Sequence, residues 1–200
     1  MLALLALRTR LSREKMHENR RGLSTRLEIT PPFNLNGVPV TGEASVTIRE
    51  KRADDWPLIQ RWAEQIGWSQ YMSRIHPHTF TPDSFPNREN VCWYVIVVDG
   101  LDAGEIWLEK KTAGDDTAIL GILIGDPHLH GRGIGRRAIP LAIADARERL
   151  RFDRVELHTR LSNRRAIACY RRCGFRVASE GEKVFPDGSR MPYCTMRLET

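Results

Sequence analysis

The sequence lacks a long apolar run, and this limits where the protein can act. No segment approaches the roughly 18 consecutive apolar residues that a membrane-spanning helix requires. The apolar start, MLALLAL, has no basic region before it and no small-residue cleavage site after it, so a secretory signal is not expected. We therefore expect a cytoplasmic protein, and an Arg-rich transit peptide over residues 8–26 is the alternative.

Cysteine is scarce, and its spacing excludes the common zinc sites. The four cysteines form no CxxC pair; Cys169 and Cys173 are four residues apart, without a second pair of ligands nearby. His76 and His78 flank a proline, again without a third ligand in range. We predict neither a metal site nor a disulfide, and we interpret the cysteines as small apolar residues in a reducing compartment.

Charge of one sign is in excess only at the start of the chain. The formal net charge is +6; residues 1–30 hold seven Arg and Lys against three Glu, a net of +4, so +2 remains for the other residues. Residues 1–45 show no sustained periodicity and contain three prolines. We predict a poorly ordered basic extension over 1–45 and one folded domain over 46–200. Because no aromatic residues are interleaved with the basic ones, nucleic-acid binding is disfavoured.

The rest of the chain alternates between patterns of period 2 and patterns typical of helices, which predicts an α/β fold. The expected strands cover residues 45–52, 91–98, 103–110, 117–124, 154–159, 175–179 and 191–198. The expected helices cover residues 55–67, 131–150 and 163–173, with a further short helix after residue 68. This gives a mixed central sheet of about six to seven strands flanked by about four helices. Pro140 lies inside the second helix and should kink it.

A glycine-rich segment lies between the buried strand at 117–124 and the next helix. It reads His130-Gly131-Arg132-Gly133-Ile134-Gly135. Glycines let a backbone turn tightly and approach a ligand closely, and the first turn of a helix offers unpaired N–H groups to a phosphate. We predict a pyrophosphate site here, with Arg132, Arg136 and Arg137 adding positive charge. The alternative is a glycine turn that binds nothing.

Two better-known pyrophosphate loops do not fit this segment. A P-loop would end in Gly-Lys-Ser or Gly-Lys-Thr, whereas this segment ends in Gly-Arg-Arg. A dinucleotide-binding fold would place the loop in an early βαβ unit. Here the loop follows a meander of three predicted strands, which argues against both classes.

This loop and a second motif resemble the GNAT family of N-acetyltransferases. The family loop reads Q/R-x-x-G-x-G/A, and residues 130–135 depart from it only in having His130 first. The second signature is Asn163-x-x-Ala166-x-x-x-Tyr170-x-x-x-Gly174-Phe175, and residues 163–175 match it throughout. Gly125-Asp126-Pro127 resembles the branch that contains ribosomal-protein N-terminal and aminoglycoside 6′-N-acetyltransferases. The resemblance covers roughly residues 46–198.

The resemblance implies a site as well as a fold. It implies a sheet splayed at the cofactor site and acetyl-CoA as co-substrate, with no metal. In such proteins a freed strand pairs with the pantetheine amides, and one freed N–H holds the oxyanion. The implied cofactor-binding residues are Leu123, Ile124, Gly125, His130, Gly131, Arg132, Gly133, Ile134, Gly135, Arg136, Asn163 and Tyr170. Tyr170 would also protonate the leaving thiolate; Asn163 would cap a helix as well as contact the cofactor.

A general base must take a proton from the ammonium form of the acceptor before it attacks. Glu105 is the first candidate, because the strand that carries it borders the acceptor site in the family. Glu109, Asp115 and Asp116 are alternatives, and His158 is a candidate proton relay.

The function that these residues and the resemblance predict is acetyl transfer from acetyl-CoA to a primary amine by direct attack in a ternary complex. The acceptor would be a small molecule, such as an aminoglycoside, or a protein N-terminus. Two other classes stay open: an acyl-CoA sensor without chemistry, and a ribosome- or nucleic-acid-binding protein that uses its basic extension. A homodimer is a further possible assembly of the protein.

Overall fold

The computed structural model describes residues 43–80 and 89–200, and it contains the α/β fold expected from the sequence. Its strands are β1 (Val46–Glu50), β2 (Val91–Val98), β3 (Leu101–Glu109), β4 (Thr117–Ile124), β5 (Arg154–Arg160), β6 (Arg176–Val184) and β7 (Arg190–Glu199). Its α-helices are α1 (Trp56–Ile66), α2 (Ile134–Leu150) and α3 (Arg164–Arg172). Most ends agree with the prediction within a few residues, although β6 extends well past residue 179. The extension predicted over 1–45 lies almost entirely outside the described residues.

The described residues contain three α-helices rather than about four. The short helix expected after residue 68 is a single 3₁₀ turn, Trp68–Gln70, and two further 3₁₀ turns lie at Ala53–Asp55 and Pro127–Leu129. No helix in the described ranges is long and apolar enough to cross a membrane.

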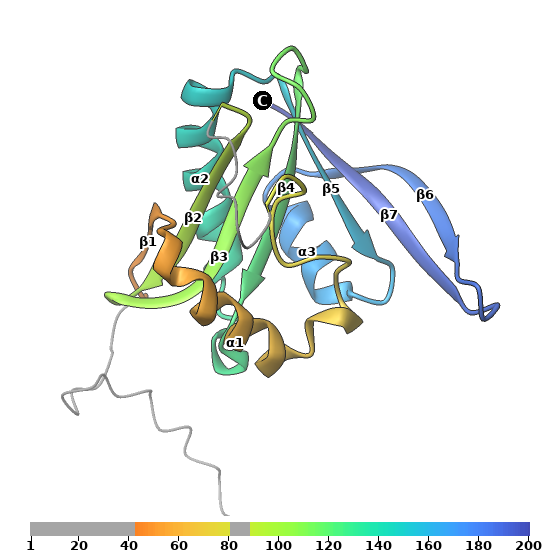
Figure 1. Ribbon diagram of the computed structural model, residues 1–200, viewed down its shortest axis with the longest axis horizontal. Helices are drawn as coiled ribbons and strands as arrows, with labels where there is room; N and C mark the ends of the chain where they lie inside the picture. Colours follow the sequence, from red (N-terminus) through yellow and green to blue (C-terminus); the bar gives the residue numbers. More distant parts are fainter. Residues whose placement is uncertain (1–42, 81–88) are drawn as a thin grey trace, which may run out of the picture. The chain divides into compact units, whose positions relative to one another are not determined.

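All seven strands form one sheet in the order β1-β2-β3-β4-β5-β7-β6 (Figure 1). Neighbouring strands are antiparallel, with the exception of β4 and β5, which are parallel because the chain crosses over between them through α2. The turn at Asp99-Gly100 joins β2 to β3, with φ angles of 50° and 81°. Positive φ at both positions is typical of the tight hairpin that the sequence predicts there.

The parallel pair β4–β5 separates after three residue pairs, at Ile119 and Glu156. Beyond that point β4 stays paired only with β3, and β5 stays paired only with β7. The sheet is therefore splayed between the second halves of β4 and β5. This confirms the splayed sheet that the sequence predicts.

Side-chain alternation along β4 divides the core between the two faces of the sheet. Leu120 and its neighbours at every second position pack with α2 and Tyr170, whereas Leu123 packs with α1, Trp93 and Trp107. Figure 1 shows α1 and α2 on opposite faces. The two faces of the sheet consequently have different surroundings at the splay.

Helix α2 continues through Pro140, which is exposed to solvent. Pro140 has no N–H, so the carbonyl of Arg136 loses its partner in the next helical turn. The Cys173 thiol lies 3.9 Å from that carbonyl and donates to it. This contact offers the freed carbonyl a weak donor from α3; the kink expected at Pro140 stays a prediction.

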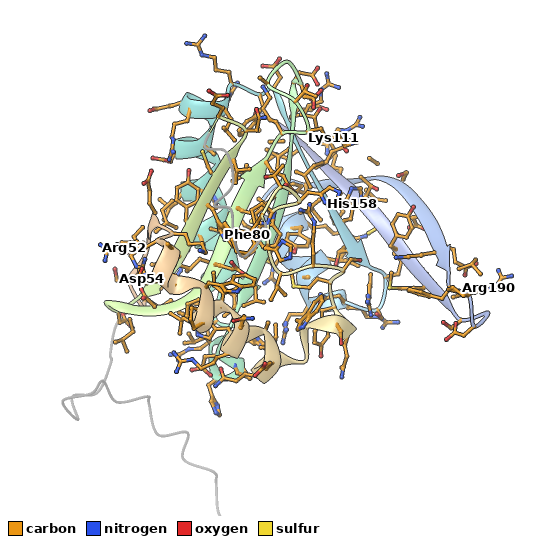
Figure 2. The ribbon with its side chains drawn as sticks, in the orientation of Figure 1. Arg52, Asp54, Phe80, Lys111, His158 and Arg190 are labelled. Carbon is orange, nitrogen blue, oxygen red and sulfur yellow. The ribbon has the colours of Figure 1, made fainter. Side chains whose placement is uncertain are left out.

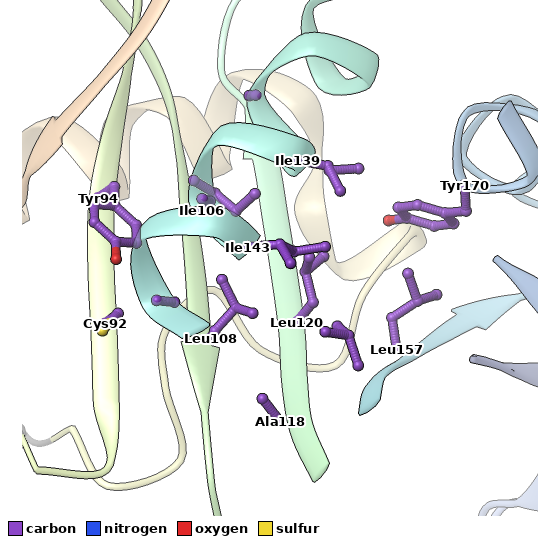
Figure 3. Packing of buried hydrophobic residues seen from close by; sticks show 14 of the residues in the cluster. Cys92, Tyr94, Ile106, Leu108, Ala118, Leu120, Ile139, Ile143, Leu157 and Tyr170 are labelled. Atoms are coloured by element: carbon purple, nitrogen blue, oxygen red, sulfur yellow. The ribbon is translucent and has the colours of Figure 1, made fainter. Parts of the chain in front are cut away.

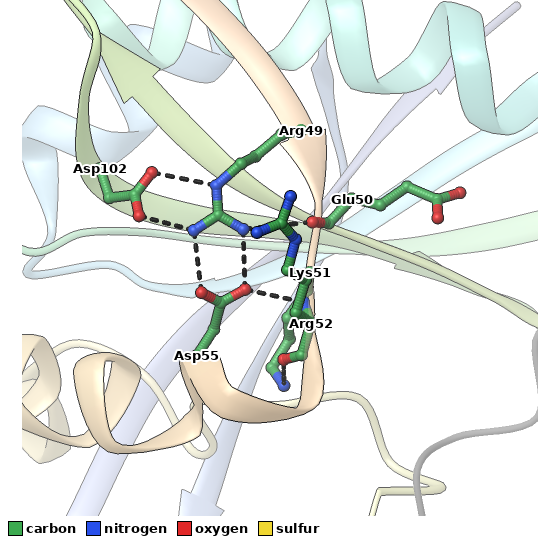
Figure 4. A network of polar contacts seen from close by, with 6 residues as sticks. All are labelled: Arg49, Glu50, Lys51, Arg52, Asp55 and Asp102. Atoms are coloured by element: carbon green, nitrogen blue, oxygen red, sulfur yellow. Dashed lines mark hydrogen bonds and ion pairs between the residues drawn. The ribbon is translucent and has the colours of Figure 1, made fainter.

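Arg49 connects three segments at the edge of the sheet (Figure 4). Its guanidinium donates to both carboxylate oxygens of Asp55, at 2.8 Å each, and to those of Asp102, at 3.1 and 2.6 Å. Asp55 also accepts from the Arg52 N–H, at 2.7 Å. The hydrogen bonds from Arg49 lower the pKa of Asp55 and raise that of the guanidinium. The start of α1 is thereby fixed to β1 and β3.

We expect Arg49→Met to lower the free energy of unfolding by about 2 kcal/mol, because it leaves two carboxylates without their charged donor. The control is Arg190→Met, which removes an ion pair with Glu182 whose side chains are 67% and 37% exposed. That change should cost less than about 1 kcal/mol. Urea denaturation of both variants measures the difference, and equal losses would contradict this role for Arg49.

Candidate active site

The glycine loop connects β4 to α2 in a conformation that depends on its glycines. Gly131 and Gly133 have φ angles of 78° and 77°, in the left-handed region that side chains disfavour. Gly135 is needed for a different reason: a Cβ there would lie 3.2 Å from the Cys169 sulfur on α3. The first two glycines therefore shape the turn, and the third allows α2 to approach α3.

Five backbone N–H groups of this loop are unpaired. Among the hydrogen bonds within residues 43–80 and 89–200, none comes from the N–H of Gly131, Gly133, Ile134, Gly135 or Arg136, and the first helical bond of α2 is from Arg137 to Gly133. A Cβ at Gly131 would meet no atom within 4 Å, so the backbone there is open. The arrangement is a cluster of free donors at the positive end of a helix, which suits a phosphate group.

The arginines near this loop differ in their availability. Arg132 and Arg136 are exposed beside it. Arg137, which the sequence also suggested, instead donates to the Ala44 carbonyl and lies 3.5 Å from the Glu43 carboxylate. We therefore retain Arg132 and Arg136 as the charges near the loop and exclude Arg137.

The second half of β4 directs backbone groups into the splay. The Gly125 N–H donates to the Ala103 carbonyl of β3 at 2.9 Å. In an antiparallel ladder the hydrogen-bonded positions alternate. The backbone N–H and C=O groups of Leu123 and Gly125 therefore face β3, whereas those of Ile122 and Ile124 point away from β3, toward the splay. Of Leu123, Ile124 and Gly125, which are predicted to bind the cofactor, Ile124 has its backbone N–H and C=O on the open side, as does Ile122.

His130 ties the loop to the end of β4. Its Nε2 lies 2.9 Å from the Ile124 carbonyl, and because a carbonyl can only accept, Nε2 carries the proton. The residue that departs from the family loop thus holds the first turn of that loop against the splayed strand. No sequence pattern predicts this contact, because tertiary structure brings the two residues together.

Tyr170 and Asn163 lie where the second motif predicts. The Asn163 side chain caps α3 by accepting from the Ala166 N–H at 3.3 Å, which confirms its capping role. Figure 3 shows the Tyr170 ring extending from α3 toward Ile139 of α2, with Leu120 of β4 and Leu157 of β5 nearby in the same core cluster. Burial raises the pKa of the Tyr170 hydroxyl, so it keeps its proton at neutral pH. The phenol lies on the α2 face of the sheet.

Glu105 is fully buried on the opposite face, in the strand next to the splayed half of β4. It pairs in register with Leu123. One carboxylate oxygen accepts from the Trp93 indole N–H at 2.8 Å, and the other, Oε1, has no hydrogen-bond partner among residues 43–80 and 89–200. Burial raises the pKa of Glu105 to about 8, although the indole donor and Lys51 oppose the shift. An unpaired buried carboxyl oxygen with a pKa near neutrality is typical of a proton-transfer site.

The alternative bases are occupied or distant. Glu109 forms an ion pair with Arg74 and accepts from the His78 N–H at 2.6 Å. Asp115 accepts from the Thr112 N–H, and Asp116 binds Arg154 and the Thr117 hydroxyl. Both aspartates precede β4, so about eight residues of extended chain, roughly 25 Å, separate them from its far end. These contacts favour Glu105.

The histidines and cysteines of the described ranges make contacts of other kinds. No group of three or more potential ligands occurs in the described residues. His76 bonds to the Pro77 carbonyl at 2.8 Å, and all four cysteines are free thiols. His158 is exposed on β5, where its Nδ1 lies 3.0 Å from the Thr195 hydroxyl (Figure 2).

Comparison with solved structures shows the same fold in acetyltransferases. An aminoglycoside acetyltransferase, AAC(6')-Ib, in complex with coenzyme A is 19% identical, with a TM-score of 0.60 over 78% of this chain and 95% of that one. Spermidine N-acetyltransferase from Vibrio cholerae, in complex with CoA and spermine, is 18% identical, with a TM-score of 0.61 over 77% and 95%. A GNAT-family acetyltransferase from Streptococcus pneumoniae is 18% identical, with a TM-score of 0.62 over 78% and 100%. No curated protein sequence matches.

The splayed sheet and the open glycine loop define the class as an acetyltransferase. A model of the acetyltransferase (GNAT) family matches residues 49–175. The chain belongs to this family.

The raised pKa of Glu105 predicts a specific pH dependence of stability. Between its ordinary pKa of 4.5 and about 8, the folded protein keeps a proton on Glu105 that the unfolded chain releases. Stability should therefore fall as the pH rises through this window. Glu105→Gln removes this effect, so the stability of the variant relative to the parent should increase from pH 5 to pH 8. Urea denaturation at several pH values measures it; a constant difference would mean that Glu105 titrates normally.

Proposed function

We propose that this protein transfers the acetyl group of acetyl-CoA to a primary amine. The observation that carries the proposal is the combination of the β4–β5 splay with the unpaired N–H groups of Gly131, Gly133, Ile134, Gly135 and Arg136. These groups fit a pyrophosphate followed by an extended amide chain. Acetyl-CoA supplies both, together with an activated acetyl thioester.

The residues that would hold acetyl-CoA come from the loop and from β4. The five loop N–H groups, with Arg132 and Arg136, would bind the pyrophosphate. The backbone groups of Ile122 and Ile124 would pair with pantetheine as an added strand does. Leu123 and Gly125 shape this edge through their bonds to β3, and His130 fixes it through the Ile124 carbonyl. Asn163 positions the start of α3 beside this site.

Two side chains on opposite faces of the sheet would move the protons. Glu105 would accept a proton from the acceptor ammonium, through a water molecule because its side chain is fully buried. The Tyr170 hydroxyl, whose raised pKa keeps it protonated, would donate to the leaving sulfur. His158 is held by Thr195 on the face that carries Glu105, where it would relay protons to solvent.

Tyr170→Phe tests the proton donor. We expect kcat to fall about 100-fold, which is the usual contribution of a general acid, while the Kd for CoA stays within about twofold because the ring remains. Thiol release from acetyl-CoA measures kcat, and calorimetry measures Kd.

The matched control for this test is Tyr94→Phe. Tyr94 is also buried, but its hydroxyl donates to Asp145 at 2.6 Å, away from the splay. Its loss should leave kcat unchanged. If the two variants lose activity equally, Tyr170 contributes only by packing in the core and does not donate a proton.

Gly131→Ala tests the loop. A Cβ there enters open space but strains a left-handed φ by about 1–2 kcal/mol. We expect about a tenfold loss of CoA affinity as the loop shifts. Gly188→Ala imposes the same strain in open space at φ +81° in the β6–β7 turn, and should not change CoA binding. Equal affinities of the two variants would contradict the loop as the cofactor site.

The acceptors left open by the sequence are a small amine, such as an aminoglycoside, and a protein N-terminus. A thioester-consumption screen over aminoglycosides, polyamines, amino acids and short peptides separates them. Tight CoA binding without turnover on any amine would instead indicate an acyl-CoA sensor. The basic extension, on which nucleic-acid binding would depend, lies outside the described residues.

A further inference from the structure

The strand register places two rows of side chains across the splay, on the face that carries Glu105. Residues paired between strands point to the same face, so Glu105 and Leu123 share a face, as do Arg160 and its partner Tyr193 on β7. Continuing the β4–β5 register past Ile119 and Glu156 brings Leu123 opposite Arg160 across the splay. The row therefore runs from Glu105 to Tyr193 through the point where the strands separate.

This is the face from which an acceptor can approach. The other face of β5 and β7 carries Leu157 and Met196, which pack in the core with Tyr170 of α3. Helix α1 packs against β3 and β4, and His158 on β5 is exposed. A molecule that reaches the splay from this side has Arg160, His158 and Tyr193 toward β5 and β7. The buried Glu105 lies beyond Leu123, toward β3.

Arg160 is a free cation in this row. Within the described ranges, it forms no ion pair, and its Nε is buried without a hydrogen-bond partner. Apart from the buried Glu105, the carboxylates that β3 and β5 carry on this face are already engaged, since Glu156 binds Arg197 at 2.6 Å and Glu109 binds Arg74. A buried guanidinium nitrogen without an acceptor costs free energy, and an oxyanion of a ligand would satisfy it.

We propose, building on the acetyl-transfer function, that the acceptor is a carboxylate-bearing amine of the amino-acid class. Arg160 binds its carboxylate, and the His158 and Tyr193 side chains flank it, while the amine faces the splay and Glu105. A single unpaired arginine matches the single charge of a carboxylate. A polycation would instead need acidic groups toward β5 and β7, where the register places Arg160 and His158.

The experiment compares each amino acid with its own amide, using lysine with lysinamide and phenylalanine with phenylalaninamide. The amide has the less basic amine, so a preference for the acid cannot come from a larger neutral fraction. We expect the acid to exceed the amide at least tenfold in kcat/KM, the size of effect that a charged hydrogen bond gives. Spermidine, kanamycin and phosphoethanolamine complete the acceptor panel.

Arg160→Gln should remove this preference by raising the KM for the acid about tenfold, with little effect on the amide or on CoA binding. The control, Arg190→Gln, removes the same charge at the far end of the β6–β7 hairpin (Figure 2) and should leave the preference intact. An equal loss on acid and amide in Arg160→Gln would overturn the proposal in favour of a structural role.

The acceptor panel separates this proposal from the function on which it rests. Turnover that favours the amides, spermidine or kanamycin would overturn the carboxylate site and leave acetyl transfer standing. Better turnover of phosphoethanolamine than of any amino acid would overturn it in favour of a phosphate. Absence of thioester consumption with every amine, despite CoA binding, would refute acetyl transfer and this proposal together.

Discussion

The site depends on the loss of hydrogen bonding between β4 and β5 after Ile119 and Glu156. Each strand keeps its other neighbour, so the sheet remains intact on both sides of the splay. Backbone groups cannot stay unpaired in a protein interior without a large cost. The Ile124 carbonyl bonds to His130, and the other groups freed at Ile122 and Ile124 must meet water or a ligand. A sheet that stops pairing here would offer the proposed cofactor a binding edge made of backbone groups.

Other contacts hold this edge in place from both ends. His130 bonds to the Ile124 carbonyl, and a Cβ on Gly125 would collide with the Trp62 ring of α1 at 2.1 Å. At the other end, Gly121 has no side chain because the Trp107 ring occupies that space. Gly121 in β4 and Gly125 just after it thus allow two tryptophans to pack closely against this segment where it has only one partner strand. Rigidity of this kind preorganises a binding edge.

Local sequence patterns predicted the elements whose identity depends on nearby residues. The apolar run at 117–124 became β4, the glycine loop opened α2, and Gly174 ended α3 with a φ of 93°. The phase of β4 relative to β3 could not be predicted in this way. A shift of one residue reverses which backbone groups face the splay, and the sequence of one strand does not contain its register with another. The prediction therefore named Leu123, Ile124 and Gly125 as one segment, and the strand pairing distinguishes the backbone groups of Ile122 and Ile124 from those of Leu123 and Gly125.

The burial of Glu105 could not be predicted from the sequence for a similar reason. Its neighbours Ile106 and Trp107 indicate a strand, but the apolar cover on that face comes from Trp93 of β2 and from α1. Likewise, Arg160 and Tyr193 are 33 positions apart and meet only because β5 pairs with β7. The sequence showed a glutamate on a strand and an arginine at the end of another, and only the strand order places them on either side of one splay.

Burial pushes the two proposed proton-transfer groups toward their neutral forms, and this has a consequence for the order of events. Glu105, with a pKa of about 8, is largely protonated at neutral pH in the free protein, and Tyr170 is fully so. A cationic amine near Glu105 would favour the carboxylate, so the acceptor would itself help to ionise its base. Tyr170, on the other face and among apolar side chains, would gain no such neighbour and would remain a donor. The proposed base, which the acceptor would help to ionise, would thus lie on one face of the sheet. The proposed acid, which would stay protonated, would lie on the other.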